Sequence, residues 1–192
     1  EEGNLYIPLH RLSNYTEIKP IVQGLYSNSK EIIIKSFEEL DIICNFEGNL
    51  EQLTEDDVRQ ILFLSDLNQL VEKKKDNFGN TEITEIRKKA LESLFLIINK
   101  MKIKQISIEI FTQFEICPMI VHQLPDLHVP LILDLLLDYQ SEFVGQILSE
   151  IEFIMDKLKT YHERKYIEIY SVIQVIFLLF KYQTFFEMGP IV

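Results

Sequence analysis

A thirteen-residue pattern recurs three times along this chain of 192 residues, and each copy predicts an amphipathic helix. In every copy an acidic residue precedes a large apolar anchor, and apolar or small residues follow that anchor at positions 4, 5, 8, 10 and 11. The anchor and positions 4, 8 and 11 share one face of an α-helix, and position 5 widens that face. The copies are residues 31–43, 85–97 and 142–154, with anchors Ile32, Ile86 and Phe143.

The spacing of the copies predicts a protein built from stacked helical units. The anchors are 54 and 57 residues apart (86 − 32 and 143 − 86), and self-similarity at such a period is typical of repeat architectures. One unit cannot bury its apolar face alone, so we expect the three helices to lie side by side. Residues that can accept hydrogen bonds from a first helical turn precede the copies: Ser29, Thr84 or Thr81, and Ser141.

Two other stretches give local predictions. Thr54 followed by three acids, Glu55, Asp56 and Asp57, predicts a helix that begins there and runs on to the lysines at 73–75. Residues 103–116 alternate apolar and polar, which alone would predict a strand. A single strand has no partner in a helical stack, so we predict a helix there.

Composition and charge narrow the possible partners. Hydrophobic residues make up 47% of the chain, and only 6 Gly and 6 Pro interrupt it, which is typical of one helical domain with a sizeable core. The net charge of −11 argues against a nucleic-acid partner, which needs a basic face, and against acidic membrane surfaces. The most apolar run, 172–180, is shorter than the ~20 residues of a membrane span, so no membrane partner is expected.

The cysteines and the start of the chain bear on its location. Cys44 and Cys117 lie among apolar residues, which predicts two free, buried thiols in a reducing compartment; a disulfide between them is the alternative. The start of the sequence shows no basic stretch before an apolar run, as a signal peptide would. We therefore expect a cytoplasmic or nuclear protein, or both. The chain begins at Glu1 rather than Met, which suggests a piece of something longer.

No motif predicts catalysis, a metal or a cofactor. The four histidines form no pair at helical spacing, and none has a cysteine or aspartate at metal-ligand spacing. The sequence contains no glycine-rich phosphate loop, no G-x-S-x-G and no C-x-x-C. Adjacent acids such as Glu38 and Glu39 diverge by about 100 degrees on a helix, so they are better interpreted as solvated residues than as an acid pair. We predict that the protein is not an enzyme.

A resemblance to the armadillo/HEAT-type helical repeat family rests on a second repeated motif. The segment F-E-I-C-P-M-I-V at 114–121 recurs as F-E-M-G-P-I-V at 186–192, and both resemble the junction between the first two helices of an armadillo repeat. A leucine-rich segment at 131–137, a polar link and the third copy of the pattern follow in the order of such a repeat. The segment I-K-P-I-V-Q-G-L-Y at 18–26 is similar to late repeats of the importin alpha group.

This resemblance implies an all-α fold, a right-handed α-solenoid of armadillo-like helical repeats. Residues 1–15 would be an irregular lead-in, and 16–192 the repeat domain. Its units would span about 16–49, 54–102 and 103–159, with a partial unit at 160–192. The steps of 54 and 57 residues exceed the ~40–47 usual for such repeats, so insertions or extended helices are implied.

The family also implies a binding surface, because its third helices line a concave groove that takes an extended peptide. Importin alpha members use a Trp and an Asn at fixed points of that helix. The Trp positions correspond here to Glu38, Glu92 and Ser149, and the Asn positions to Ile42, Leu96 and Phe153. The chain has no Trp, so the Trp–Asn ladder is absent. The apolar positions flanked by acids predict a groove for an apolar helix or a mixed peptide with a basic residue; alternatively, these side chains pack on neighbouring repeats.

Together these features predict a non-enzymatic protein–protein interaction scaffold or adaptor that binds a partner peptide or helix. One alternative is a nuclear-transport adaptor of importin alpha type, and another is a structural subunit of a large assembly with both faces covered.

Overall fold

All the regular secondary structure in the described part of the chain is helical. The computed structural model describes residues 18–45, 50–74, 77–103, 116–139, 143–161 and 166–187, and these hold ten helices and no strand. The all-α prediction is therefore confirmed for these residues. The helices are α1 (Ile18–Gly24), α2 (Lys30–Ile43), α4 (Glu55–Ser65), α5 (Leu67–Lys74), α6 (Asn80–Ile103), α8 (Ile116–Val121), α9 (His128–Tyr139), α10 (Phe143–Leu148), α11 (Ile151–Tyr161) and α12 (Tyr166–Glu187).

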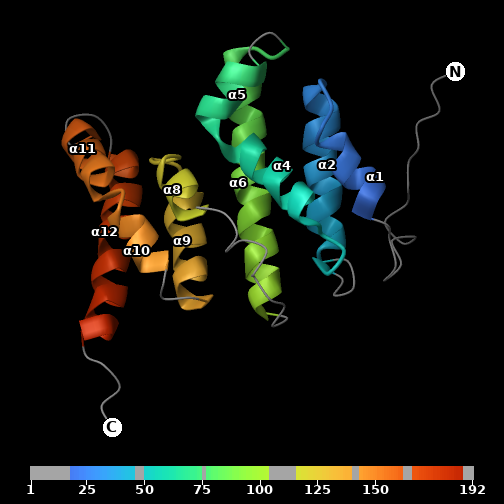
Figure 1. The fold of residues 1–192 in the computed structure, drawn as a ribbon. Coiled ribbons are helices and arrows are strands. Elements are labelled where there is room, and N and C mark those ends of the chain that lie inside the picture. The colour runs from blue at the N-terminus through green and yellow to red at the C-terminus, as the bar shows by residue number, and fades with distance from the viewer. Residues whose placement is uncertain are drawn as a thin grey trace, which may run out of the picture.

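The helices form an array whose order in space follows their order in the sequence. Four of them, α2, α6, α9 and α12, make a row in which each packs on the next (Figure 1). The shorter helices pack against this row: α1 on α2, α4 and α5 on α6, α8 and α10 on α9, and α11 on α12. One continuous apolar core runs between the two sets of helices. The array therefore has two ends, with α1 at one and α11 and α12 at the other.

The second copy of the repeated pattern folds as predicted. It lies within α6, where Ile86, Ala90, Leu94 and Ile97 are all buried. These residues fall on the single helical face that the spacing defines. The prediction that the first and second copies lie side by side is also confirmed, because α2 packs directly on α6.

The anchor of the first copy is not where the pattern places it. Ile32 is 50% exposed, whereas Ile86 is fully buried and Phe143 is 2% exposed. In α2 the buried face begins one residue later, at Ile33, and continues through Phe37. Three isoleucines follow one another at 32–34, so hydrophobic periodicity alone does not fix which of them faces the core.

The third copy is not one helix, and it does not take the third place in the row. Its residues form α10 and α11, separated by a turn at Ser149 and Glu150, and the third place belongs to α9. Gly145 weakens the first of these helices because glycine is a poor helix former. The Ser149 hydroxyl donates to the carbonyl of Gln146 at 2.7 Å, a local bond that competes with helix continuation.

Helix ends are predicted correctly only in part. Thr54 caps α4 reciprocally: its Oγ1 accepts from the backbone N–H of Asp57 at 3.3 Å, and Asp57 Oδ2 accepts from the N–H of Thr54 at 2.8 Å. Ser29 caps α2. The caps expected at Thr84 or Thr81 are wrong, since α6 already begins at Asn80. The helix predicted to run from 54 to 75 is also wrong, because α4 ends at Ser65 and α5 starts after Asp66.

Polar contacts join consecutive helices of the row. Two ion pairs join α2 to α6, namely Lys30–Glu85 at 2.8 Å and Asp41–Lys89 at 2.7 Å. One pair joins α6 to the turn before α9, Arg87–Asp126 at 3.5 Å, and one joins α9 to α12, Asp134–Lys181 at 3.0 Å. Asp138 of α9 bonds both Lys102 of α6 and the hydroxyl of Tyr182 of α12. Each helix of the row is thus fixed to its neighbours by charge as well as by packing.

Several predictions fall outside the described residues: the lead-in at 1–15, most of the helix at 103–116, Ser141, and the end of the second junction motif at 188–192. The repeat boundaries stay a prediction. Within the described ranges, no helix has both the length and the apolar character that crossing a membrane requires.

Candidate partner-binding surface

The structure does not bring the six predicted groove residues onto one surface. Glu38 and Ile42 lie on α2, and Glu92 and Leu96 lie on the adjacent α6. The remaining two, Ser149 and Phe153, lie beyond α9 in the turn after α10 and in α11 (Figure 1). Their mapping assumed a third template helix in the row, and that helix is interrupted.

Phe153 is also partly covered. The ring of His122 stacks on it, with centroids 4.3 Å apart and planes inclined by 13°. The Lys157 ammonium lies 5.0 Å from the Phe153 centroid, and His122 is held by Glu150 at 2.7 Å. This aromatic position thus contributes to a local cluster rather than to an open groove.

At the α2–α6 contact, Glu92 lies beside the ion pair that joins the two helices. The Lys89 ammonium lies 2.7 Å from Asp41 Oδ2 of α2 and 3.4 Å from Glu92 Oε2. Burial raises the pKa of Asp41 in spite of the nearby Lys89 charge. Ile42 and Leu96 are half-buried. Ile42 and Leu96 thus fit the alternative that such side chains pack between neighbouring helices, whereas Glu38 is exposed.

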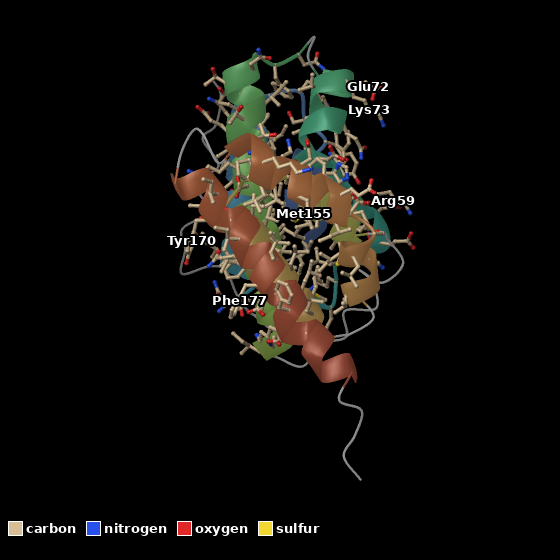
Figure 2. All side chains as sticks on the ribbon, turned by 90° about the vertical axis from the view of Figure 1, so that its left-hand side faces the viewer. Arg59, Glu72, Lys73, Met155, Tyr170 and Phe177 are labelled. Atoms are coloured by element: carbon tan, nitrogen blue, oxygen red, sulfur yellow. The ribbon has the colours of Figure 1, made fainter. Side chains whose placement is uncertain are left out.

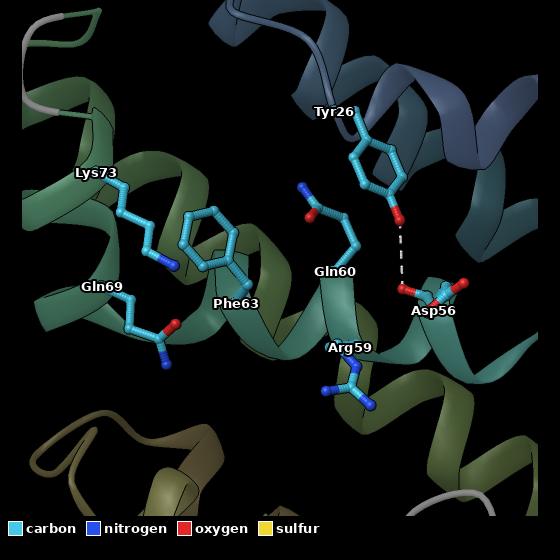
Figure 3. A pocket seen from close by; sticks show the side chains of 7 residues that line it. All are labelled: Tyr26, Asp56, Arg59, Gln60, Phe63, Gln69 and Lys73. Carbon is cyan, nitrogen blue, oxygen red and sulfur yellow. Dashed lines mark hydrogen bonds between the residues drawn. The ribbon is translucent and has the colours of Figure 1, made fainter.

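A hollow that the sequence analysis did not predict lies between the α1–α2 turn, α4 and α5. Its volume is about 530 Å³, and Figure 3 shows its lining side chains. We call it the α4–α5 pocket, defined by Tyr26, Asp56, Arg59, Gln60, Phe63, Gln69 and Lys73. Residues 56, 59, 60 and 63 share one face of α4, so the mixed aromatic and polar stripe is visible in the sequence. That stripe alone does not reveal which elements complete the pocket.

Two hydrogen bonds fix the wall between the α1–α2 turn and α4. The Tyr26 hydroxyl donates to the carbonyl of Asp56 at 3.3 Å, and Gln60 Nε2 donates to the carbonyl of Leu25 at 2.9 Å. Figure 3 shows Gln60 between the rings of Tyr26 and Phe63. Burial, together with Asp57 and Asp56, raises the pKa of Tyr26, so its hydroxyl stays protonated and keeps its role as donor.

The other side of the pocket combines an aromatic ring with cations. Lys73 Nζ of α5 lies 5.4 Å from the centroid of Phe63, within cation–π range. Arg59 Nη2 bonds Glu55 at 2.6 Å, so part of its charge is already matched. Gln69 Nε2 donates to Asp66 at 3.0 Å, and Asp66 also accepts the backbone N–H of Gln69, which orients the start of α5. The pocket thus offers two rings, two amides and a lysine whose ammonium faces a ring.

None of the seven lining side chains of the α4–α5 pocket is Ser, Thr, Cys or His. Elsewhere, Cys44 and Cys117 are free and buried, as predicted. Burial raises the pKa of each thiol to about 12, so neither is a thiolate at neutral pH. Among the residues that the structure describes, no group of three or more His, Cys, Asp and Glu is placed to hold a metal ion.

Comparison of the chain with protein-family models, with curated proteins and with solved structures finds no match. Functional assignment therefore depends on the residues and the geometry of the chain itself.

Proposed function

We propose that the protein is a non-enzymatic interaction scaffold that binds a short segment of a partner protein in the α4–α5 pocket. The observation that supports this proposal most directly is the pocket itself, in which two rings, two amides and cations from separate helices converge. In the same proposal the two-layered array is a right-handed, armadillo-like α-solenoid, whose consecutive helices present surface residues along its length.

The volume and the residue types of the pocket favour a peptide segment. A hollow of about 530 Å³ falls within the range of ligand pockets, and tyrosine and arginine are enriched among the residues that dominate binding energy at protein interfaces. The rings of Tyr26 and Phe63 provide apolar contact for one side chain. The amides of Gln60 and Gln69 suit the peptide backbone, because each amide both donates and accepts hydrogen bonds.

The charge of Lys73 indicates which class of partner peptide the α4–α5 pocket would bind. Lys73 places an ammonium beside the Phe63 ring, and a carboxylate of the partner next to its apolar side chain would pair with it. The net charge of −11 opposes an acidic partner at long range, but exposed charges more than about 8 Å away are largely screened at physiological salt. We therefore expect a segment in which an acidic residue adjoins a large apolar residue.

A structural subunit of a larger assembly is the second candidate, and the apolar outer face of α12 favours it. The nuclear-transport alternative and the cytoplasmic or nuclear location stay predictions.

Selection of peptides on the full chain tests the proposal. Peptides from a random display library are selected on immobilised protein, and their binding is measured by fluorescence anisotropy to the wild type, Phe63→Ala and Lys73→Glu. Removing the ring contact should cost about 1.5–3 kcal/mol, which corresponds to a ten- to hundredfold weaker Kd. Val71→Ala and Lys159→Glu change an exposed apolar residue and an exposed lysine outside the pocket, so they should leave binding unchanged. If no peptide is enriched, or if the selected peptides bind both pocket variants as tightly as the wild type, the proposal is wrong.

A further inference from the structure

The outermost helix of the array turns an apolar face to solvent. Four large side chains of α12 are exposed: Tyr170 by 56%, Ile173 by 49%, Phe177 by 69% and Phe180 by 65%. Their spacing of three, four and three residues places them on one side of the helix. Figure 2 looks onto this end of the array and labels Tyr170 and Phe177 on α12 and Met155 on α11. No charged residue occurs between 169 and 180, so the face lacks the polar character of a capping helix.

The same face continues onto the neighbouring helix of the row. A hollow of about 230 Å³ lies between α9 and α12, and Leu131 of α9 lines it together with Ile173 and Phe177. Leu131 is itself exposed. We call this surface the α12 face, defined by Leu131, Tyr170, Ile173, Phe177 and Phe180. A helix that is apolar on every side is normally buried on every side.

The spacing of the four exposed α12 residues is the same from either end, although the residue types differ. Tyr170 and Phe180 lie five residues from position 175 in opposite directions, and Ile173 and Phe177 lie two residues from it. In an antiparallel pair of identical helices related by a two-fold axis at this position, Ile173 of one copy faces Phe177 of the other. Each outer aromatic ring then faces the other outer ring. Such self-complementarity is what an isologous interface requires.

The exposed area suffices for a weak interface. With ~200 Å² for each large side chain, the four exposed fractions leave about 500 Å² uncovered on each copy, and about 1,000 Å² on two. That total is near the lower limit of specific interfaces, and Leu131 adds to it. Because the stretch from 169 to 180 is uncharged, pairing it with itself brings no like charges into direct contact.

From this register, the exposed area and the uncharged stretch of α12 from 169 to 180, we infer that the α12 face binds a second copy of this chain, with the two α12 helices antiparallel. The interface lies at the α12 end of the array, and α9 separates it from α6, on which the pocket helices α4 and α5 pack, so it does not depend on the proposed peptide site. A dimer of this kind holds two such pockets on one particle. Two linked sites bind a bivalent partner more tightly than one.

Sedimentation of the full chain gives the first test. Since an interface of this area is weak, we expect mostly monomer at about 1 μM and a substantial fraction of dimer at about 100 μM. Added salt should strengthen the dimer, because it screens the repulsion between two copies that each carry a net charge of −11. Phe177→Asp should weaken dimerisation at least tenfold without loss of helicity by circular dichroism. Ile103→Asp, an equally exposed change at the end of α6, is the matched control and should leave it unchanged.

Disulfide trapping tests the register in chains that keep the rest of the face. A mixture of Ile173→Cys and Phe177→Cys proteins should form the mixed disulfide faster than either protein forms its own, since only the mixed pair is placed in direct opposition. Cys44 and Cys117 are buried and should not compete. A chain that stays monomeric at about 100 μM, or a dimer that is insensitive to Phe177→Asp, refutes the inference. Equal or faster trapping of either single protein refutes the antiparallel register. If circular dichroism shows that Phe177→Asp is unfolded, its loss of dimer is not counted. The disulfide-trapping result alone then decides whether the inference holds.

Discussion

Replacement of Asp126 by Asn should destabilise the fold at neutral pH and leave it almost unaffected in acid. Asp126 lies in the turn before α9 and is nearly buried. Its Oδ1 accepts from the His128 backbone N–H at 3.0 Å and lies 3.0 Å from His128 Nδ1, and its Oδ2 lies 3.5 Å from Arg87 Nη2 of α6. One carboxylate thus orients the start of α9 and joins it to α6.

The size of the effect follows from these contacts. Asn at this position can still accept the backbone bond from His128, but it cannot balance the charge of Arg87. A hydrogen bond to a charged group contributes about 1.5–3 kcal/mol, so a loss of about 2 kcal/mol is expected. In a chain of this length, 1 kcal/mol corresponds to about 2–4 °C in Tm, so Tm should fall by about 4–8 °C at pH 7.

The pH dependence has a definite sign. Burial alone would raise the pKa of Asp126, but the hydrogen bonds from the His128 ring and backbone and the charge of Arg87 outweigh it, and the pKa is lowered. A lowered pKa stabilises the folded state above the unfolded value of about 3.9. That contribution disappears as the pH falls through the lower, folded value. The Tm difference between wild type and Asp126→Asn should therefore shrink steadily below about pH 4.

Thermal unfolding monitored by circular dichroism from pH 7 down to about pH 2.5 would measure both Tm values. Glu39→Gln, which removes a carboxylate in an exposed pair on α2, is the matched control and should change Tm by no more than about 1 °C at any pH. A Tm difference that stays constant into acid, or one that widens, would refute the assignment of this stability to the charge of Asp126.

Three further predictions follow from the packing. Phe37→Ala should lower the free energy of unfolding, measured with denaturant, by about 3–5 kcal/mol because the ring is fully buried. Ile32 is exposed, so Ile32→Ala should change it by less than about 1 kcal/mol. A larger loss for Ile32→Ala than for Phe37→Ala would mean that Ile32 faces the core, as the repeated pattern predicts. Gly24→Ala should destabilise by about 1–3 kcal/mol, since its Cβ would lie 2.0 Å from the Ser36 hydroxyl, and Ser36→Ala should relieve most of that loss in the double variant. The two cysteine thiols should react with a thiol reagent at neutral pH only as fast as the protein unfolds, because each has a pKa raised to about 12 by burial; rapid labelling of the native chain would contradict their burial.

The sequence predicts this fold best where one helix repeats one period without interruption. In α6, Ile86, Ala90 and Leu94 recur at intervals of four, and the structure buries all of them. At Thr54 the cap is set by residues within a single turn, and it forms as predicted. Both features depend on residues that are close together in the sequence, so they can be read from the sequence without knowing the fold.

Some predictions that needed tertiary information were wrong, although the packing of α2 on α6 was predicted correctly. The run of isoleucines at 32–34 has no unique inner face until α1 and α6 pack against it. The third copy of the pattern satisfies the apolar spacing, but Gly145 and Ser149 interrupt the helix, a weakness that a template of apolar positions does not register. Because of the same interruption, Ser149 and Phe153 lie in the turn after α10 and in α11 rather than in one helix of the row.

The α4–α5 pocket could not be predicted because three separate segments build it. The α4 stripe that includes Arg59 and Phe63 is visible in the sequence as a polar and aromatic face. That Tyr26 and Lys73 meet this stripe depends on how the α1–α2 turn and α5 pack on α4. Sequence periodicity describes the face of one helix, whereas a concave site is a property of several.

The bonds of Asp138 to Lys102 and Tyr182 make one carboxylate common to three consecutive members of the row. In an array where helices otherwise meet only their neighbours, a force applied to the C-terminus would peel α12 away first. Detaching it would remove the Tyr182 hydroxyl from this carboxylate and leave the bond to Lys102 of α6. Since α12 packs on α9 and α9 packs on α6, we expect α12 to detach before α9 when the chain is pulled from that end.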